Sequence, residues 1–427
     1  MNSLIQIRIF VTQYFIKMAR EFENLLITVY GEDQPGVTSK LTGILANYDA
    51  QILDIGKADI QRNLSLGILF RAPMQYSGNI IKDLILICNE IGVTIKFKPI
   101  SDEDYSEWVA QQGKNRYIVT ILGRKLSAKD IASVADIVSR EGFNIDDIKR
   151  LTGRIPLEEN ERPSKASVEF SVRGLPTNKE DLQRKLMHLS TEMGIDISFQ
   201  EDGMFRRMRR LICFDMDSTL IRTEVIDELA EKAGVGEQVK AITEAAMRGE
   251  IDFTESFKQR VALLKGLDES AMKEIADKLP ITEGVDRLMY VLKRVGFKIA
   301  ILSGGFTYFG NYLKRKYDID YVYANNLEIK DGKLTGRHTG EIVDGNRKAE
   351  LLKLIAQVEN VDIRQTVAVG DGANDLPMLG TAGLGIAFHA KPKVKESAKQ
   401  SISTTGIDGV LYFLGYKDSY MEEAGGR

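Results

Sequence analysis

The apolar run Leu211 to Phe214 ends in two carboxylates, Asp215 and Asp217, that are spaced one residue apart. Side chains alternate along a β-strand, so both carboxylates point to the same side if the strand persists. Two carboxylates that close repel each other unless a cation lies between them. The pattern indicates a buried strand whose end holds a metal ion or a nucleophile, although an isolated Asp-x-Asp also occurs in solvated acidic turns.

Length and composition predict several soluble domains. The 427 residues suggest about three domains at roughly 150 residues each. Hydrophobic residues make up 43% and charged residues 28% of the chain, which is typical of globular proteins. The net charge of -3 gives no broad electrostatic footprint for nucleic acid. One local basic run, Arg206-Arg207-x-Arg209-Arg210, is explained equally well by a solvated linker.

Cysteine and histidine usage limits the location and the metal chemistry. The two cysteines, Cys88 and Cys213, each lie in an apolar stretch, as buried thiols in a reducing compartment do, so we expect a cytoplasmic protein. The three histidines are scattered, which makes a histidine-rich zinc site improbable. Any metal ion is therefore expected to be held mainly by oxygen ligands.

The N-terminal segment 1–23 is expected to be an extension and no membrane anchor. Its apolar part, Leu4 to Ile16, is interrupted by polar residues and is shorter than the roughly 20 residues of a membrane helix. The charges lie within and after this part, and no small-residue cleavage site follows, unlike in a signal peptide. We expect no membrane partner.

An internal repeat precedes the carboxylates. The stretch Glu90 to Phe97 matches Glu192 to Phe199 at a constant offset of 102 residues (194 minus 92). Each copy has the pattern strand, helix, two strands, helix, strand, which is the ferredoxin-like α+β order. In the first copy, the turn Asp33-Gln34-Pro35-Gly36 separates the first strand from the first helix. In the second copy, Ser127 is positioned to cap the corresponding helix.

This turn and its following helix resemble the ACT family of small-molecule-sensing domains over residues 24–100. The copy at 115–200 is a divergent relative, with Gly-Arg-Lys-Leu in place of the turn and a charged insertion near 158–163. The resemblance implies an amino-acid effector, with Asp33 and Gly36 as the contributing residues, and a homodimer. A purely associative role for both copies remains an equal alternative.

From Arg210 onward, strands and helices alternate, which predicts an open, mostly parallel sheet. Ligands of such sheets bind at the carboxyl ends of the strands. Polar residues follow four predicted strands or begin the next helix there: Asp215 with Asp217, Ser303-Gly304-Gly305, Lys348, and Gly370-Asp371-Gly372-Ala373-Asn374-Asp375. Lys348 lies in the first turn of a predicted helix, where a cation is unfavourable unless an anion compensates it.

In this order and spacing, the four positions resemble the motifs of the haloacid dehalogenase-like phosphatases over residues 210–415, and within them the phosphoserine phosphatases. The expected fold is a Rossmann-like α/β sheet with a helical cap at about 223–283, preceded by the two ACT-type domains. Glu224 and Arg260, both in the cap, match the family positions that hold the ammonium and the carboxylate of phosphoserine.

The resemblance also implies a mechanism. Asp215 is the nucleophile that forms an aspartyl-phosphate, and Asp217 is the general acid and base. Mg²⁺ is expected between Asp215, the Asp217 carbonyl and Asp371. The phosphate and substrate are held by Ser303, Gly304, Lys348 and Asn374, with Asp375 steadying the metal site or Lys348 from behind.

Three alternatives were considered beside this hypothesis. A phosphotransferase that passes the phosphoryl group to another alcohol, such as homoserine, would use the same intermediate and stays open. An idle amino-acid sensor would be expected to lack Asp215 or Asp217, and both are present. A dinucleotide-dependent oxidoreductase is disfavoured because Gly370 and Gly372 lack the third glycine of the fingerprint.

Overall fold

The computed structural model describes residues 22–111, 115–154 and 165–423. Most of the predicted extension 1–23 and the whole charged insertion at 158–163 lie outside these ranges. The chain divides into two compact units, residues 1–113 and residues 114–427. Among the described residues, no helix is both long and apolar enough to cross a membrane.

The first unit holds one α+β domain with a four-stranded antiparallel sheet in the order β2-β3-β1-β4. Alternate residues of β1, such as Ile27 and Val29, are buried against Leu41 and Leu84 of the two helices. The predicted element order is confirmed: β1 (Phe22–Glu32), α2 (Val37–Ala46), β2 (Gln51–Ile60), β3 (Asn63–Pro73), a short 3-10 helix (Met74–Tyr76), α3 (Ser77–Glu90) and β4 (Thr94–Ile100).

A helix for which the sequence analysis assigned no element, α4 (Asp102–Ala110), follows β4. The Ser101 side chain accepts a hydrogen bond from the Asp104 N–H at 2.9 Å and so caps its first turn. Three acidic residues in that turn, Asp102, Glu103 and Asp104, complement the helix dipole. Local capping therefore explains why this exposed segment is helical.

The second unit begins with a domain of the same order, whose antiparallel sheet is β6-β7-β5-β8. Ser127 caps α5 as predicted, in a capping box with Asp130. The elements are β5 (Arg116–Gly123), α5 (Ala128–Arg140), β6 (Asn144–Arg150), β7 (Ala166–Arg173), α6 (Lys179–Met193) and β8 (Asp196–Glu201). The duplicated ferredoxin-like order is thus present in both copies.

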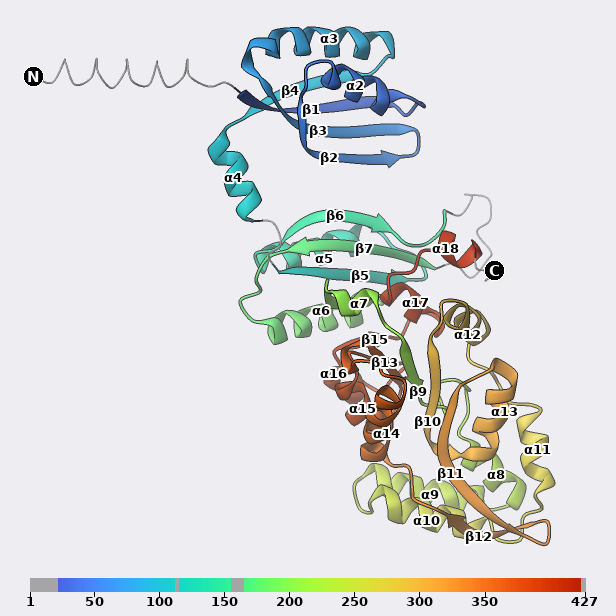
Figure 1. Cartoon of the computed structure of the whole chain (residues 1–427). Coiled ribbons are helices and arrows are strands. Elements are labelled where there is room, and N and C mark those ends of the chain that lie inside the picture. Colours follow the sequence, from blue (N-terminus) through green and yellow to red (C-terminus); the bar gives the residue numbers. More distant parts are fainter. Residues whose placement is uncertain (1–21, 112–114, 155–164, 424–427) are drawn as a thin grey trace, which may run out of the picture. The chain divides into compact units, whose positions relative to one another are not determined.

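The rest of the second unit is built on a seven-stranded sheet in the order β12-β11-β10-β9-β13-β14-β15 (Figure 1). All neighbours run parallel except β12, which is antiparallel to β11. The prediction of a mostly parallel sheet is confirmed. The strands are β9 (Leu211–Phe214), β10 (Lys298–Phe306), β11 (Tyr321–Lys330), β12 (Lys333–Thr339), β13 (Thr366–Gly370), β14 (Leu384–Phe388) and β15 (Gln400–Ile402).

Helices cover both faces of this sheet. Along β9, Ile212 and Phe214 belong to one core cluster and Leu211 and Cys213 to the other, as strand alternation requires. The helices of the sheet region are α7 (Met204–Arg207), α12 (Val285–Arg294), α13 (Thr307–Tyr317), α14 (Gly345–Val358), α15 (Leu376–Thr381), α16 (Pro392–Ser397), α17 (Gly409–Phe413) and α18 (Asp418–Glu423), with 3-10 turns at Ile363–Gln365 and Ala373–Asp375.

The segment between β9 and α12 forms a helical insert of α8 (Val225–Ala233), α9 (Gly236–Met247), α10 (Phe253–Leu263) and α11 (Ser270–Ala276). Its two ends are held together where the chain leaves and re-enters the sheet region. The Thr282 N–H donates to the Leu220 carbonyl at 3.0 Å, and the Arg222 N–H donates to the Pro280 carbonyl at 2.8 Å. The insert therefore leaves and re-enters the sheet region at one place. It also packs on the sheet region itself, since Phe257 and Val261 of α10 share a core cluster with Phe214 of β9, and the Gly266 N–H donates to the Leu334 carbonyl of β12 at 2.8 Å.

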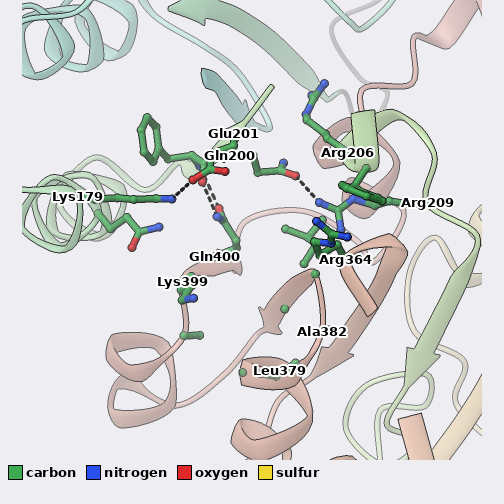
Figure 2. A pocket seen from close by; sticks show the side chains of 18 of the residues that line it. Lys179, Gln200, Glu201, Arg206, Arg209, Arg364, Leu379, Ala382, Lys399 and Gln400 are labelled. Atoms are coloured by element: carbon green, nitrogen blue, oxygen red, sulfur yellow. Dashed lines mark hydrogen bonds and ion pairs between the residues drawn. The ribbon is translucent and has the colours of Figure 1, made fainter. Parts of the chain in front are cut away.

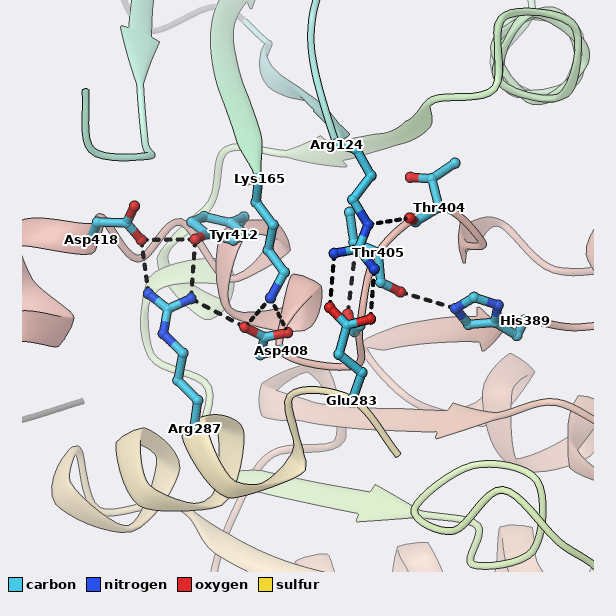
Figure 3. A network of polar contacts seen from close by, with 11 residues as sticks. Arg124, Lys165, Glu283, Arg287, His389, Thr404, Thr405, Asp408, Tyr412 and Asp418 are labelled. Atoms are coloured by element: carbon cyan, nitrogen blue, oxygen red, sulfur yellow. Dashed lines mark hydrogen bonds and ion pairs between the residues drawn. The ribbon is translucent and has the colours of Figure 1, made fainter. Parts of the chain in front are cut away.

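The second ACT-like domain packs directly on the sheet region within this unit. The Gln400 side chain at β15 makes two hydrogen bonds with the backbone of Phe199 at β8, of 2.8 and 3.1 Å (Figure 2). A polar network elsewhere in the unit includes ion pairs of Lys165 and Arg287 with Asp408 (Figure 3). Asp408 is buried, so these contacts are part of the interior of the unit.

Candidate active site

The predicted site residues gather at the carboxyl ends of neighbouring strands. Asp215 follows β9, Asp371 follows β13, and these two strands pair in parallel. The Asp215 N–H donates to the Val369 carbonyl at 2.9 Å, which continues this pairing to the end of the sheet. The shared edge therefore brings the first and the fourth motif together, as the sequence predicts.

Three carboxylates form a compact acidic group at this edge. Asp215, Asp371 and Asp375 each offer one oxygen, and these oxygens all lie within 4.8 Å of one another. The Thr219 hydroxyl donates to Asp371 Oδ1 at 3.2 Å and fixes that carboxylate. The sequence analysis gave Thr219 no role. Its only signal was its position two residues after Asp217.

Lys348 supplies the cation in this group. Its Nζ lies 2.8 Å from Asp215 Oδ1 and 2.7 Å from Asp375 Oδ1, and its side chain is fully buried. Burial alone lowers the pKa of Lys348, but the two carboxylates more than offset this, so its pKa lies above the usual value. The anion expected to compensate a lysine in the first turn of α14 is thus provided by the protein itself.

The carboxylates are nevertheless short of positive charge. Burial raises the pKa of Asp371 to about 7, and repulsion from Asp215 and Asp375 acts in the same direction. Burial, with repulsion from Asp215, also raises the pKa of Asp375 to about 6, although Lys348 opposes this shift. A bound cation would relieve both effects. A set of close carboxylate oxygens fits a hard ion such as Mg²⁺.

Asp217 does not belong to the group of three carboxylates and contacts the helical insert instead. Its Oδ1 accepts a 3.4 Å hydrogen bond from the Val225 N–H at the start of α8. Burial raises the pKa of Asp217 well above its usual value, and the charges of Glu224 and Asp215 add to the shift. A buried carboxyl group that keeps its proton can serve as a general acid. A Cβ atom at Gly305 would lie 2.4 Å from Asp217 Oδ2, so this position has room only for glycine.

The Ser303-Gly304-Gly305 segment lies within β10, which is longer than the predicted strand ending at Leu302. Ser303 is buried, and its hydroxyl accepts a 3.0 Å hydrogen bond from the Gly305 N–H. Asn325, in the middle of β11 and opposite Phe306 of β10, was missed by the sequence analysis. Its amide donates to the Gly304 carbonyl at 2.8 Å and accepts from the Val343 N–H at 2.9 Å. No local pattern marks it, because it is one of two successive asparagines in the middle of a strand.

Asn374 lies in the 3-10 turn after Asp371, close to the start of α14. A Cβ atom at Gly345 would lie 2.5 Å from the Asn374 carbonyl oxygen, so the two segments are in tight backbone contact. The Gly372 N–H donates to Asp375 Oδ2 at 3.0 Å and holds that carboxylate toward Lys348. The fourth motif is therefore a tight turn that presents several polar groups to the same edge.

Glu224 and Arg260 come from the helical insert and attract each other electrostatically. Glu224 Oε1 accepts a 2.8 Å hydrogen bond from the Ser218 hydroxyl, which ties the insert to the first motif. Arg260 lies on α10 and is attracted by Glu224, Asp227 and Asp217, while burial lowers its pKa. The structure thus brings an acidic and a basic side chain of the insert to the side of the site where Asp217 lies.

Comparison with known families and proteins agrees with this geometry. A model of haloacid dehalogenase-like hydrolases matches residues 212–380, and models of ACT domains match residues 23–98 and 116–200. A phosphoserine phosphatase from Streptomyces coelicolor is 39% identical, with 94% of each chain covered. The phosphoserine phosphatase SerB2 from Mycobacterium tuberculosis is also 39% identical, over 94% of this chain and 95% of that protein.

A solved structure extends the likeness to the fold. A HAD family hydrolase from Salmonella enterica superposes with a TM-score of 0.58 at 32% identity, covering 70% of this chain and 98% of the other. The sequence matches span nearly the whole length of both bacterial relatives, including the ACT domains. The chain therefore belongs to the phosphoserine phosphatase family of haloacid dehalogenase-like hydrolases and carries two ACT domains ahead of its hydrolase domain.

Proposed function

We propose that this chain hydrolyses O-phospho-L-serine to L-serine and phosphate, with Asp215 as the nucleophile. The observation that carries the proposal is the meeting of Asp215, Asp371, Asp375 and Lys348 at one sheet edge, beside a protonatable Asp217. Phosphate monoesters hydrolyse so slowly that enzymes supply rate factors up to ~10²¹. Positioning and charge neutralisation provide most of such a factor.

The first step is attack of an Asp215 carboxylate oxygen on phosphorus. An Asp215–phosphorus bond forms as the phosphorus–oxygen bond to serine breaks, and Asp217 gives its proton to the leaving serine oxygen. Lys348 and the Ser303-Gly304 segment hold the phosphoryl oxygens. In the second step Asp217 takes a proton from water, which attacks phosphorus, releases phosphate and restores Asp215.

Mg²⁺ is the proposed cofactor, held by Asp215, Asp371 and the Asp217 carbonyl. When bound, it would offset the repulsion between the carboxylates and the phosphoryl group. Asp375 accompanies this group by pairing with Lys348 at 2.7 Å, in keeping with the supporting role expected for it. Asn374, in the same turn, is proposed to orient the substrate.

The nucleophile assignment is tested by Asp215→Asn. The variant is expected to lose phosphoserine turnover and to form no phosphorylated enzyme, because an amide nitrogen or oxygen cannot replace the carboxylate in attack. Phosphate release and mass spectrometry of the intact protein measure both effects. Asp277→Asn, at an exposed position of the insert, is the matched control. Substantial turnover by Asp215→Asn would refute the assignment.

The substrate assignment rests on Arg260, whose guanidinium can bind a carboxylate through two parallel N–H bonds. Arg260→Ala is expected to lower kcat/KM for phosphoserine at least about tenfold more than for p-nitrophenyl phosphate, which has no carboxylate. Lys258→Ala, an exposed neighbour on α10, is the control and should affect neither substrate. Equal losses on both substrates would contradict phosphoserine as the substrate.

We further propose an amino-acid effector at the first ACT domain and a homodimer formed through it. Asp33 and Gly36 line a surface pocket of about 460 Å³ together with Lys57, whose Nζ lies 2.9 Å from Asp33 Oδ2. Paired opposite charges of this kind suit the ammonium and carboxylate of an amino acid. The exposed apolar side chains of Ile52, Ile55 and Ile60 on edge strand β2 support the dimer.

A further inference from the structure

A second pocket, of about 520 Å³, lies inside the second unit where the second ACT domain meets the hydrolase sheet (Figure 2). Its wall combines residues of β8 and the following segment with residues of α15 and β14. Of the described active-site residues, none lines it. The pocket is therefore distinct from both the catalytic edge and the effector pocket at Asp33.

Only some arginines of the basic run Arg206 to Arg210 contribute to this pocket. Arg206 and Arg209 line it, whereas Arg207 and Arg210 are exposed. Arg207 lies 3.1 Å from Asp202, and Arg206 pairs with Glu169 at 2.6 Å. The interpretation of the run as a solvated linker therefore holds for only part of it. Arg209 is the member whose environment is still unexplained.

Arg209 is a largely enclosed cation that is held only by neutral acceptors. It donates to the Thr366 carbonyl and to Gln200 Oε1, both at 3.1 Å. Within the described residues, its buried Nε–H has no acceptor and no carboxylate forms an ion pair with it. Burial, together with the charge of nearby Arg206, lowers its pKa to about 10. A guanidinium in such surroundings is unfavourable without an anion.

The remaining lining adds both charge and apolar surface. Five cationic and two acidic side chains line the pocket. Among the cationic ones, Lys179 pairs with Glu201 and Arg364 with Asp362, so each is already compensated. Apolar surface comes from Leu376 and Leu379 of α15. The cavity thus combines an uncompensated guanidinium with a wall suited to a carbon skeleton.

We propose that this pocket binds a small organic anion, whose carboxylate or phosphate group accepts hydrogen bonds from Arg209 and whose carbon skeleton packs on Leu379. The volume is in the range of small-molecule sites. The ligand would contact α15, which begins directly after Asp375, the partner of Lys348. The site therefore lies behind the fourth motif and at the junction of two domains.

The test uses isothermal titration calorimetry of the full chain with two probes, inorganic phosphate and succinate. Phosphate is also a product of the proposed reaction and binds the catalytic edge, so its binding to the pocket is counted as a second site. The wild type and Arg210→Gln are expected to bind at least one probe equally well, and Arg209→Gln at least about tenfold more weakly, as expected for loss of a charge-assisted hydrogen bond. Both variants remove one charge and leave the catalytic edge intact, so their difference isolates the pocket. The better probe identifies the anionic group.

Gly380 offers a second variant that does not depend on the fold tolerating loss of Arg209. This lining residue is exposed, and a Cβ atom there would meet nothing within 4 Å. Gly380→Asp should abolish probe binding at the pocket by repulsion, whereas Gly380→Ala should bind like the wild type. Pocket binding by Gly380→Asp or Arg209→Gln that equals the wild type overturns the proposal, as does failure of both probes to bind the pocket of the wild type.

Discussion

The two ACT domains share one element order but use the loop after their first strand in opposite ways. In the first domain, the Asp33-Gln34-Pro35-Gly36 turn borders an open pocket, and Gly36 enters α2 with a φ of 95° that favours glycine. In the second, Arg124 of the same loop donates to both carboxylate oxygens of Glu283, at 2.8 and 2.6 Å, and to the Thr404 carbonyl at 3.1 Å (Figure 3).

The last strands of the two copies show the same contrast. Strand β4 of the first copy has no fully buried residue, whereas in β8 of the second copy five of six residues are buried. Strand β8 is covered because β15 of the hydrolase sheet packs beside it and Gln400 bonds to its backbone. The duplicated fold thus has a loop beside a pocket in one copy and is packed on the hydrolase sheet in the other.

The largest effect on stability is expected in the second copy, which packs on the hydrolase sheet. Asp408→Asn removes the buried anion that pairs with Lys165 and Arg287. Breaking a buried ion pair from one side costs about 3–5 kcal/mol, so the free energy of unfolding of the second unit should fall by about 3 kcal/mol. Urea unfolding of the full chain measures it. A loss below about 1 kcal/mol would show that the network adds little to docking.

A smaller effect is expected on the proposed association through the first copy. Ile55→Lys places a charge on the exposed apolar strand β2 and should weaken the proposed homodimer at least about tenfold. Ile148→Lys, at the equivalent position of β6 in the second copy, is the matched control and should leave the dimer intact. Analytical ultracentrifugation distinguishes them. If only the Ile148 variant dissociates, the dimer contact lies on the second copy, and the proposal for the first copy is wrong.

The smallest effect on stability is expected in the loop that contains Asp33. Asp33 and Lys57 form an exposed ion pair, with 34% and 42% of their side chains accessible, so Asp33→Asn should change the free energy of unfolding by less than about 0.5 kcal/mol. The same variant should lose binding of serine, the probe amino acid, while phosphoserine turnover stays unchanged. Calorimetric titration measures this, with Asp59→Asn as the control. Unchanged serine binding would remove Asp33 from the effector site.

Much of the fold could be predicted because it depends on local periodicity. The alternation of Leu211 to Phe214, the capping residue Ser127 and the order of the duplicated elements all reflect nearest-neighbour constraints. The catalytic edge could be predicted because parallel strands end together. These signals require no knowledge of which distant segments meet.

What could not be predicted depends on such distant contacts. Asn325 looks like any polar strand residue until the Gly304 carbonyl and the Val343 N–H are known to flank it. The pairing of Arg124 with Glu283 joins residues 159 apart in the chain, and nothing local marks either of them. The position of the Arg209 side chain likewise depends on a distant contact, its hydrogen bond to the Thr366 carbonyl at the start of β13.

Gly305 shows how narrow the tolerance of this catalytic edge is. One added carbon atom at that position would overlap the Asp217 carboxylate, at 2.4 Å. Asp217, the proposed proton donor, and β10, the strand proposed to hold the phosphoryl group, are therefore fitted to each other, so a side chain at position 305 would displace one of them.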